Sequence, residues 1–103
     1  MPRGKDSPSR KPDFVEKQRK GKEFGKDLAH RMFEFYKQKE NQPENFQWKF
    51  FPDMLENYCR ENIHTLHEDF ESLSVKEKEL LRVESGEEAY KWSVNLIIDS
   101  MED

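Results

Sequence analysis

The stretch PDMLENYCRENIHTLHEDFESL, residues 52–73, carries the most regular apolar pattern in this chain. Its apolar residues follow one another at spacings of four, four, three, four and three: Leu55, Cys59, Ile63, Leu66, Phe70 and Leu73. Residues three and four apart lie on the same side of an α-helix. Pro52 suits the first helical position, where its missing N–H is not needed. The pattern therefore predicts a helix over residues 52–73.

Two serine capping boxes follow this stretch, SVKE at residues 74–77 and SGEE at residues 85–88. In a capping box the serine side chain and the glutamate three residues later satisfy each other's backbone N–H groups at the start of a helix. The boxes predict helices at about 75–83 and 86–101, with a bend at Gly86 if the two run on into one. The second is apolar around more than half its circumference, so we expect it to be the most buried element.

Upstream, Phe24, Leu28, Met32, Phe35 and Tyr36 mark one face of another amphipathic helix. Glycine weakens a helix interior, and residues 21 and 25 are both glycine. We therefore expect this helix to be firm from about residue 24, to fray towards residue 13, and to end near residue 39. A polar loop follows at residues 40–45.

The fold class predicted from these patterns is all-α, a small bundle of three or four helices. Only residues 46–50 show a trace of strand-like alternation. Residues 1–23 are expected to form a flexible basic arm that frays into the first helix, because prolines and polar residues dominate its start. Residues 24–103 are expected to form one acidic helical domain.

Charge is divided unevenly between the two parts of the chain. Residues 1–26 hold nine Lys and Arg against four Asp and Glu, whereas residues 27–103 hold nine against eighteen. Such an asymmetry suggests that the two parts face different partners. The arm fits contact with nucleic acid, a nuclear localisation signal or a merely solubilising tail. The basic residues concerned are Arg3, Lys5, Arg10, Lys11, Lys17, Arg19, Lys20 and Lys22, and Ser7, before Pro8, is a candidate phosphorylation site.

No catalytic motif is found in the sequence, so the protein is expected not to be an enzyme and to need no cofactor or small-molecule substrate. Cys59 lies on the apolar seam, which favours a core thiol over a nucleophile. Cys59 and His64 point about 140° apart on a helix, and no fourth ligand lies at a familiar spacing, so we expect His64 and His67 to be surface histidines and no metal site to form. A single cysteine and the lack of a long apolar run favour a nuclear or cytoplasmic protein, the nucleus slightly, that is neither secreted nor bound to a membrane.

The aromatic segment of residues 46–51 has two interpretations. Phe46, Trp48 and Phe50 form either an exposed anchor for a partner protein or a fold-back that closes the core between the first two helices. The second is favoured, since so short a domain needs the apolar area.

The sequence FESLSVKEK at residues 70–78, followed by Leu81, Ser85 and Trp92, resembles the segment that joins the second and third helices of an HMG box. The aromatic stretch of residues 32–36 would then take the place of that family's first helix. This resemblance implies an L-shaped three-helix domain that binds and bends duplex or structured nucleic acid.

Three hypotheses on function remain open. The first is a non-enzymatic helical module that binds an unidentified protein, with the basic arm adding contact to nucleic acid or chromatin. The second is an HMG-box-like nucleic-acid-binding domain, which requires Arg31, Lys37, Lys49 and Arg60 to converge with the arm on one face. The third is an acidic inhibitor that imitates nucleic acid and occupies the groove of a DNA-binding protein.

Overall fold

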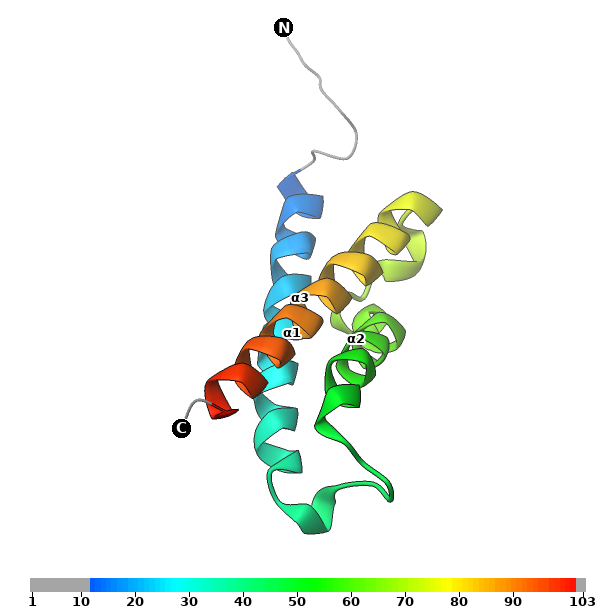
Figure 1. The fold of residues 1–103 in the computed structure, drawn as a ribbon. Helices are drawn as coiled ribbons and strands as arrows, with labels where there is room; N and C mark the ends of the chain where they lie inside the picture. The colour runs from blue at the N-terminus through cyan, green and yellow to red at the C-terminus, as the bar shows by residue number, and fades with distance from the viewer. Residues whose placement is uncertain (1–11, 102–103) are drawn as a thin grey trace, which may run out of the picture.

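A computed structural model describes residues 12–101 of the chain, and these form an all-α domain of three helices (Figure 1). The helices are α1 (Pro12–Tyr36), α2 (Phe51–Asn62) and α3 (Val75–Met101), and four short 3-10 turns, at residues 39–41, 48–50, 63–66 and 70–72, lie in the connections. Helix α3 crosses in front of α1, and α2 lies to one side of both (Figure 1). The predicted fold class is confirmed. No helix within residues 12–101 is long and apolar enough to cross a membrane.

Helix α1 begins well before Phe24, contrary to the expectation that residues 13–23 fray. Its first turn is anchored because Phe14 is buried, with 3% of its surface exposed, beside Ile63, Phe70 and Leu81. The end of the segment that we assigned to a flexible arm is thus helical from Pro12 and packed from Phe14. The described part of the basic segment belongs to the domain.

Glycine strengthens the packing of α1, although it weakens an isolated helix. A row of small residues on α1 (Gly21, Gly25, Ala29) faces a matching row on α3 (Ser85, Ala89, Ser93), and all six are buried. A Cβ at position 25 would lie 2.4 Å from the carbonyl oxygen of Ser85 and 3.0 Å from the backbone nitrogen of Ala89. The two backbones therefore touch directly at this crossing, which only glycine permits.

Helix α1 ends at Tyr36, where side-chain amides satisfy its last carbonyls. The Asn41 Nδ2 group donates to the Phe35 carbonyl at 3.0 Å, and the Gln42 Nε2 group donates to the Tyr36 carbonyl at 2.7 Å. These bonds replace the helical bonds missing at a C-terminus. They also turn the chain towards α2.

Helix α2 ends at Asn62, so the prediction of one helix through Leu73 is wrong. The Thr65 hydroxyl donates to the Asn62 carbonyl at 2.7 Å, and such local bonds compete with helix continuation. The chain then turns back, so that Ile63 and Phe70 are buried while Leu66, on the same predicted seam, is 38% exposed. The break allows Phe70 to reach Phe14.

Helix α3 is one continuous helix over residues 75–101. The first capping box is confirmed: the Ser74 N–H donates to Glu77 Oε1 at 3.0 Å, and the Glu77 N–H donates to Ser74 Oγ at 3.1 Å. The second box does not start a helix, because Ser85 is buried and its hydroxyl donates within the helix to the Arg82 carbonyl at 3.1 Å. Gly86 instead lets α3 approach α2, since a Cβ there would lie 3.0 Å from Glu56 Cγ.

The core consists of two apolar clusters, one at each end of the domain. The larger holds Leu28, Phe33, Phe51, Leu55, Cys59 and Ala89 from all three helices. The smaller holds Phe14, Ile63, Phe70 and Leu81, and Phe24 packs against both. The two clusters hold α3 in place across α1. The two ends of α3 differ in how much of their surface they bury.

Candidate interaction surfaces

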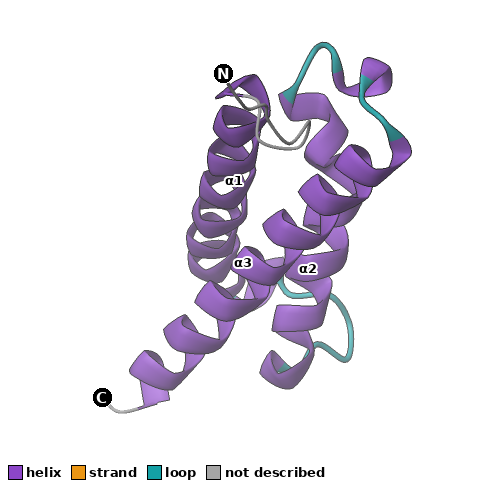
Figure 2. Ribbon diagram, turned by 90° about the horizontal axis from the view of Figure 1, so that it is seen from above, coloured by secondary structure: helices purple, strands orange, loops and turns teal. Residues whose placement is uncertain are grey.

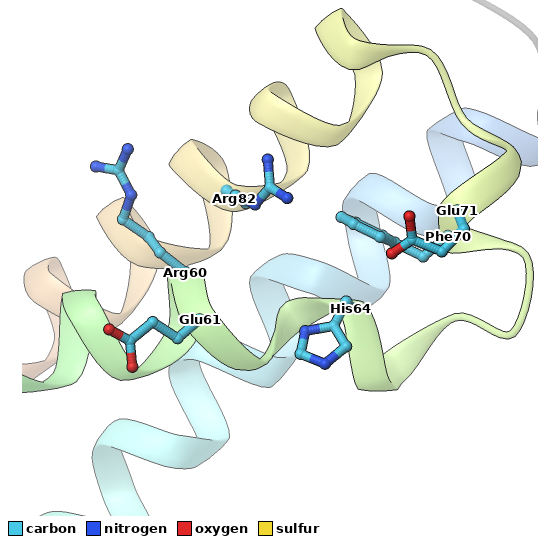
Figure 3. Close-up of a pocket in the computed structure, with 6 residues that line it drawn as sticks. All are labelled: Arg60, Glu61, His64, Phe70, Glu71 and Arg82. Carbon is cyan, nitrogen blue, oxygen red and sulfur yellow. The ribbon is translucent and has the colours of Figure 1, made fainter.

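A surface pocket of about 480 Å³ lies where the chain turns from α2 into α3 (Figure 3). Its lining comes from α2, from both 3-10 turns of the connection and from α3, namely Arg60, Glu61, His64, Phe70, Glu71 and Arg82. Arg82 reaches from α3 toward Phe70 and Glu71, and its guanidinium carbon lies 5.5 Å from the centre of the buried Phe70 ring (Figure 3). The pocket is thus a charged rim over a buried aromatic floor.

The charges of this rim are already matched by neighbours. Glu79 accepts from Arg60 Nη2 at 3.3 Å and lies 3.7 Å from Arg82 Nη1. The hydrogen bond from Lys78 at 3.0 Å lowers the pKa of the Glu71 carboxyl below its usual value. Arg60, Lys78 and Arg82 are thus balanced by three carboxylates, Glu61, Glu71 and Glu79, so the pocket offers little net attraction for an anion.

A second surface lies on the C-terminal half of α3 and is apolar. Tyr90, Val94, Ile98 and Met101 follow at spacings of four, four and three, and we call them the α3 face. Tyr90, Ile98 and Met101 are 42%, 47% and 79% exposed, and Val94 is partly buried. In two views at right angles the last turns of α3 project beyond the other helices (Figures 1 and 2). The prediction that residues 86–101 form the most buried element is wrong for this side of the helix.

The adjacent side of the same half-helix supplies the contacts with α1. Ala89 and Ser93 are fully buried, and Leu96 and Ile97 pack against the larger cluster. The Ser93 hydroxyl has no hydrogen-bond partner. Helix α3 is therefore apolar on two sides, of which α1 and α2 cover one.

The predicted aromatic anchor divides between core and surface. Phe46 and Trp48 are partly buried, with ring centres 5.1 Å apart, and Trp48 also packs at 5.2 Å from both Phe33 and Phe51. These two residues close the core, as the favoured interpretation predicted. Phe50 is 46% exposed, with Lys49 5.3 Å from its ring. A joint anchor of all three is not formed.

The basic residues proposed for nucleic-acid contact lie partly on α1. Lys17 is paired with Asp69 at 3.2 Å, and Arg19 is paired with both Glu16 and Glu23. Lys20 and Lys22 are exposed. Arg3, Lys5, Arg10, Lys11 and the candidate phosphorylation site Ser7 lie outside the described residues. Ion pairing thus engages two of the four predicted cations on α1.

The basic residues that the HMG-like hypothesis needs come from several parts of the domain: Arg31 from α1, Lys37 from the turn directly after α1, Lys49 from the turn before α2, and Arg60 from α2. Lys37 lies 3.7 Å from Glu34 Oε2, and Arg60 is bound to Glu79 of α3.

The three residues that could have served as zinc ligands, Cys59, His64 and His67, differ in burial. Cys59 is fully buried, and burial raises the pKa of its thiol to about 12, which confirms a core thiol. His64 is exposed, but His67 is buried, contrary to the expectation of a surface histidine. Burial lowers the pKa of His67, and the nearby Lys17 charge lowers it further. Within residues 12–101 no group of three or more His, Cys, Asp or Glu is arranged to hold a metal ion.

Comparisons with family models, with curated proteins and with solved structures found no match. The resemblance to an HMG box stays a prediction. Of the residues that carry this resemblance, Phe70 is buried below Arg82. The others named lie on α3, where Leu81 and Ser85 are buried and Trp92 is partly buried.

Proposed function

We propose that this protein is a non-enzymatic helical interaction module of the nucleus that binds a basic amphipathic helix of another protein through the α3 face. The basic N-terminal segment adds electrostatic contact to nucleic acid or chromatin. The observation that carries the proposal is the α3 face itself. A domain of this size with so little apolar sequence leaves a row of large apolar side chains uncovered on one helix.

The α3 face is large enough to provide useful binding energy. Burying an exposed large apolar side chain stabilises by roughly 1.5–3 kcal/mol when burial is complete. The exposed parts of Tyr90, Ile98 and Met101 together amount to less than two whole side chains, so they offer roughly 2.5–5 kcal/mol. Such a contribution suits a reversible complex of about micromolar affinity when hydrogen bonds and ion pairs at the rim add to it.

The spacing and the surrounding charge indicate the chemistry of the partner. Apolar residues at intervals of four, four and three present a straight seam, which another helix fills with its own apolar residues. Residues 12–103 hold 14 Lys and Arg against 21 Asp and Glu, a net charge of −7, so a partner helix with Lys and Arg on its polar side is attracted, whereas a second copy of this domain is repelled. The expected occupant is therefore a basic helix of a different protein.

The test compares Ile98→Asp with Val75→Asp in the full-length protein. Both place a carboxylate at an exposed apolar position of α3, since Val75 is 83% exposed, but only position 98 lies on the α3 face. We expect a protein with a basic helix to be retained from nuclear extract by wild type and by Val75→Asp, and to be lost with Ile98→Asp. Equal retention by all three proteins would exclude the α3 face, and concentration-dependent dimerisation in sedimentation would assign it to self-association instead.

A further inference from the structure

A cluster of cationic and aromatic side chains surrounds Trp92 where α3 passes over α1. The Nζ atoms of Lys26 and Lys91 lie 4.7 and 5.9 Å from the centre of the indole ring, and the His30 ring lies 5.3 Å from it. We call these four residues the Trp92 cluster. It was not found from the sequence, because Lys26 and His30 lie far from Lys91 along the chain.

Hydrogen bonds fix the orientation of the rings in the Trp92 cluster. The indole Nε1 group donates to Glu88 Oε2 at 3.1 Å, and His30 Nδ1 donates to the carbonyl of Lys26 at 2.9 Å. The cation–π contacts use the positive charge of each lysine but leave N–H donors of the ammonium groups for another acceptor. Trp92 remains only partly buried. The site thus presents ammonium groups and an aromatic surface side by side.

Three of the four carboxylates on or beside the Trp92 cluster already have partners. Lys22, exposed one turn before Lys26, adds a second lysine to this side of α1. Glu88 is the carboxylate in direct contact, and it is already bound by the indole and by Lys91 at 3.4 Å. Three further carboxylates lie nearby on α1 and α3. Glu23 is paired with Arg19, and Glu84 accepts a hydrogen bond from Gln18. Asp27 is exposed.

We propose that the Trp92 cluster is a contact site for single-stranded nucleic acid. Lys26 and Lys91 bind phosphates, and an unpaired base packs against the exposed part of Trp92 and His30. This inference rests on the proposed electrostatic contact to nucleic acid and gives it a location on the folded domain. Ammonium groups beside an aromatic surface are the combination that single-strand binding uses, whereas the bases of a duplex are stacked on one another and unavailable. An acidic peptide would use the lysines but gain little from the rings.

The test measures binding of a fluorescent oligothymidine of about 12 nucleotides to the full-length protein at several salt concentrations. The double variant Lys26→Ala/Lys91→Ala is compared with Lys39→Ala/Lys49→Ala, which removes the same charge from the connection between α1 and α2. Each lost phosphate contact lowers the slope of log K against log salt by about 0.7 for a single strand, so the first variant should lose about 1.4. The control variant should keep the wild-type slope, because its lysines lie outside the cluster.

The aromatic part of the site has its own test. Trp92→Leu should weaken oligothymidine binding roughly tenfold, with the slope unchanged because no cation is removed. Equal slopes for the two double variants would overturn the proposal, as would equal affinity for polyglutamate and oligothymidine. Ile98→Asp should leave the oligonucleotide affinity unchanged, which separates this site from the α3 face.

Discussion

Replacing Gly25 by alanine should destabilise the protein, although alanine favours helix. The new Cβ would lie 2.4 Å from the Ser85 carbonyl oxygen, about 1 Å closer than normal contact. It would also lie 3.0 Å from the Ala89 nitrogen. Both neighbours are backbone atoms, so the contact is relieved only by moving α3 away from α1. Gly21→Ala is the matched control, because its Cβ would meet the Ile63 side chain at an ordinary 3.5 Å.

The expected magnitudes separate the two variants clearly. Each gains about 1 kcal/mol of helix propensity. Overpacking costs roughly 1–3 kcal/mol, and a backbone clash belongs at or above the upper end. Gly25→Ala should therefore lose about 2 kcal/mol net and melt roughly 8–16 °C lower, whereas Gly21→Ala should melt a few degrees higher.

Thermal unfolding followed by circular dichroism and urea unfolding of the full-length variants would measure both effects. If Gly25→Ala were as stable as Gly21→Ala, the direct backbone contact between α1 and α3 would be wrong. The arrangement of α3 over α1 would then need revision, and with it the exposure of the α3 face.

Three further predictions concern single residues. Ser74→Ala should lower the free energy of unfolding in urea by about 1 kcal/mol, because it removes a helix cap. Ser85→Ala should lower it clearly less, and equal losses would contradict one continuous α3. Cys59 should react with a thiol reagent at pH 8 only as fast as the protein unfolds, and rapid native-state labelling would show that the thiol is not buried. The lowered pKa of His67 means that the unfolded state binds more protons just below pH 6.5, so the free energy of unfolding should fall as the pH drops through this range. His67→Gln should remove that part of the pH dependence, and an unchanged profile would refute it.

The sequence predicted an all-α bundle of three or four helices but not where α1 begins or where α2 ends. The seam from Leu55 to Leu73 keeps helical spacing after Asn62, yet the chain leaves the helix there. The apolar pattern shows only which residues are to be buried. A long helix and a folded-back turn can both bury Ile63 and Phe70, so the pattern does not decide between them. The turn depends on the contact between Phe70 and Phe14, which are far apart along the chain.

The same limit applies to glycine and serine. Gly25 and Ser85 were interpreted from local rules, as a weak point in a helix and as a cap. Their roles follow from the crossing of α1 and α3, where small residues allow close approach. A spacing of four between small residues on both helices was the available signal: Gly21, Gly25 and Ala29 on one, Ser85, Ala89 and Ser93 on the other.

The candidate surfaces were only partly predictable for a related reason. The apolar character of residues 86–101 is evident from the sequence, but which side of that helix α1 covers is decided by the crossing at Gly25. Trp48 was assigned to the core correctly because a small domain needs its aromatic area. Trp92 came to lie beside Lys26 only through the fold.

The most direct test of the interaction surface is site-specific photo-cross-linking in nuclear extract. A photoreactive phenylalanine derivative replaces Ile98 in one full-length protein and Val75 in another, since both residues are exposed on α3. We expect a discrete cross-linked adduct at position 98, with the attachment site in a basic amphipathic helix of the partner, and no such adduct at position 75. Cross-linking of the same protein at both positions, or of none at position 98, would contradict it.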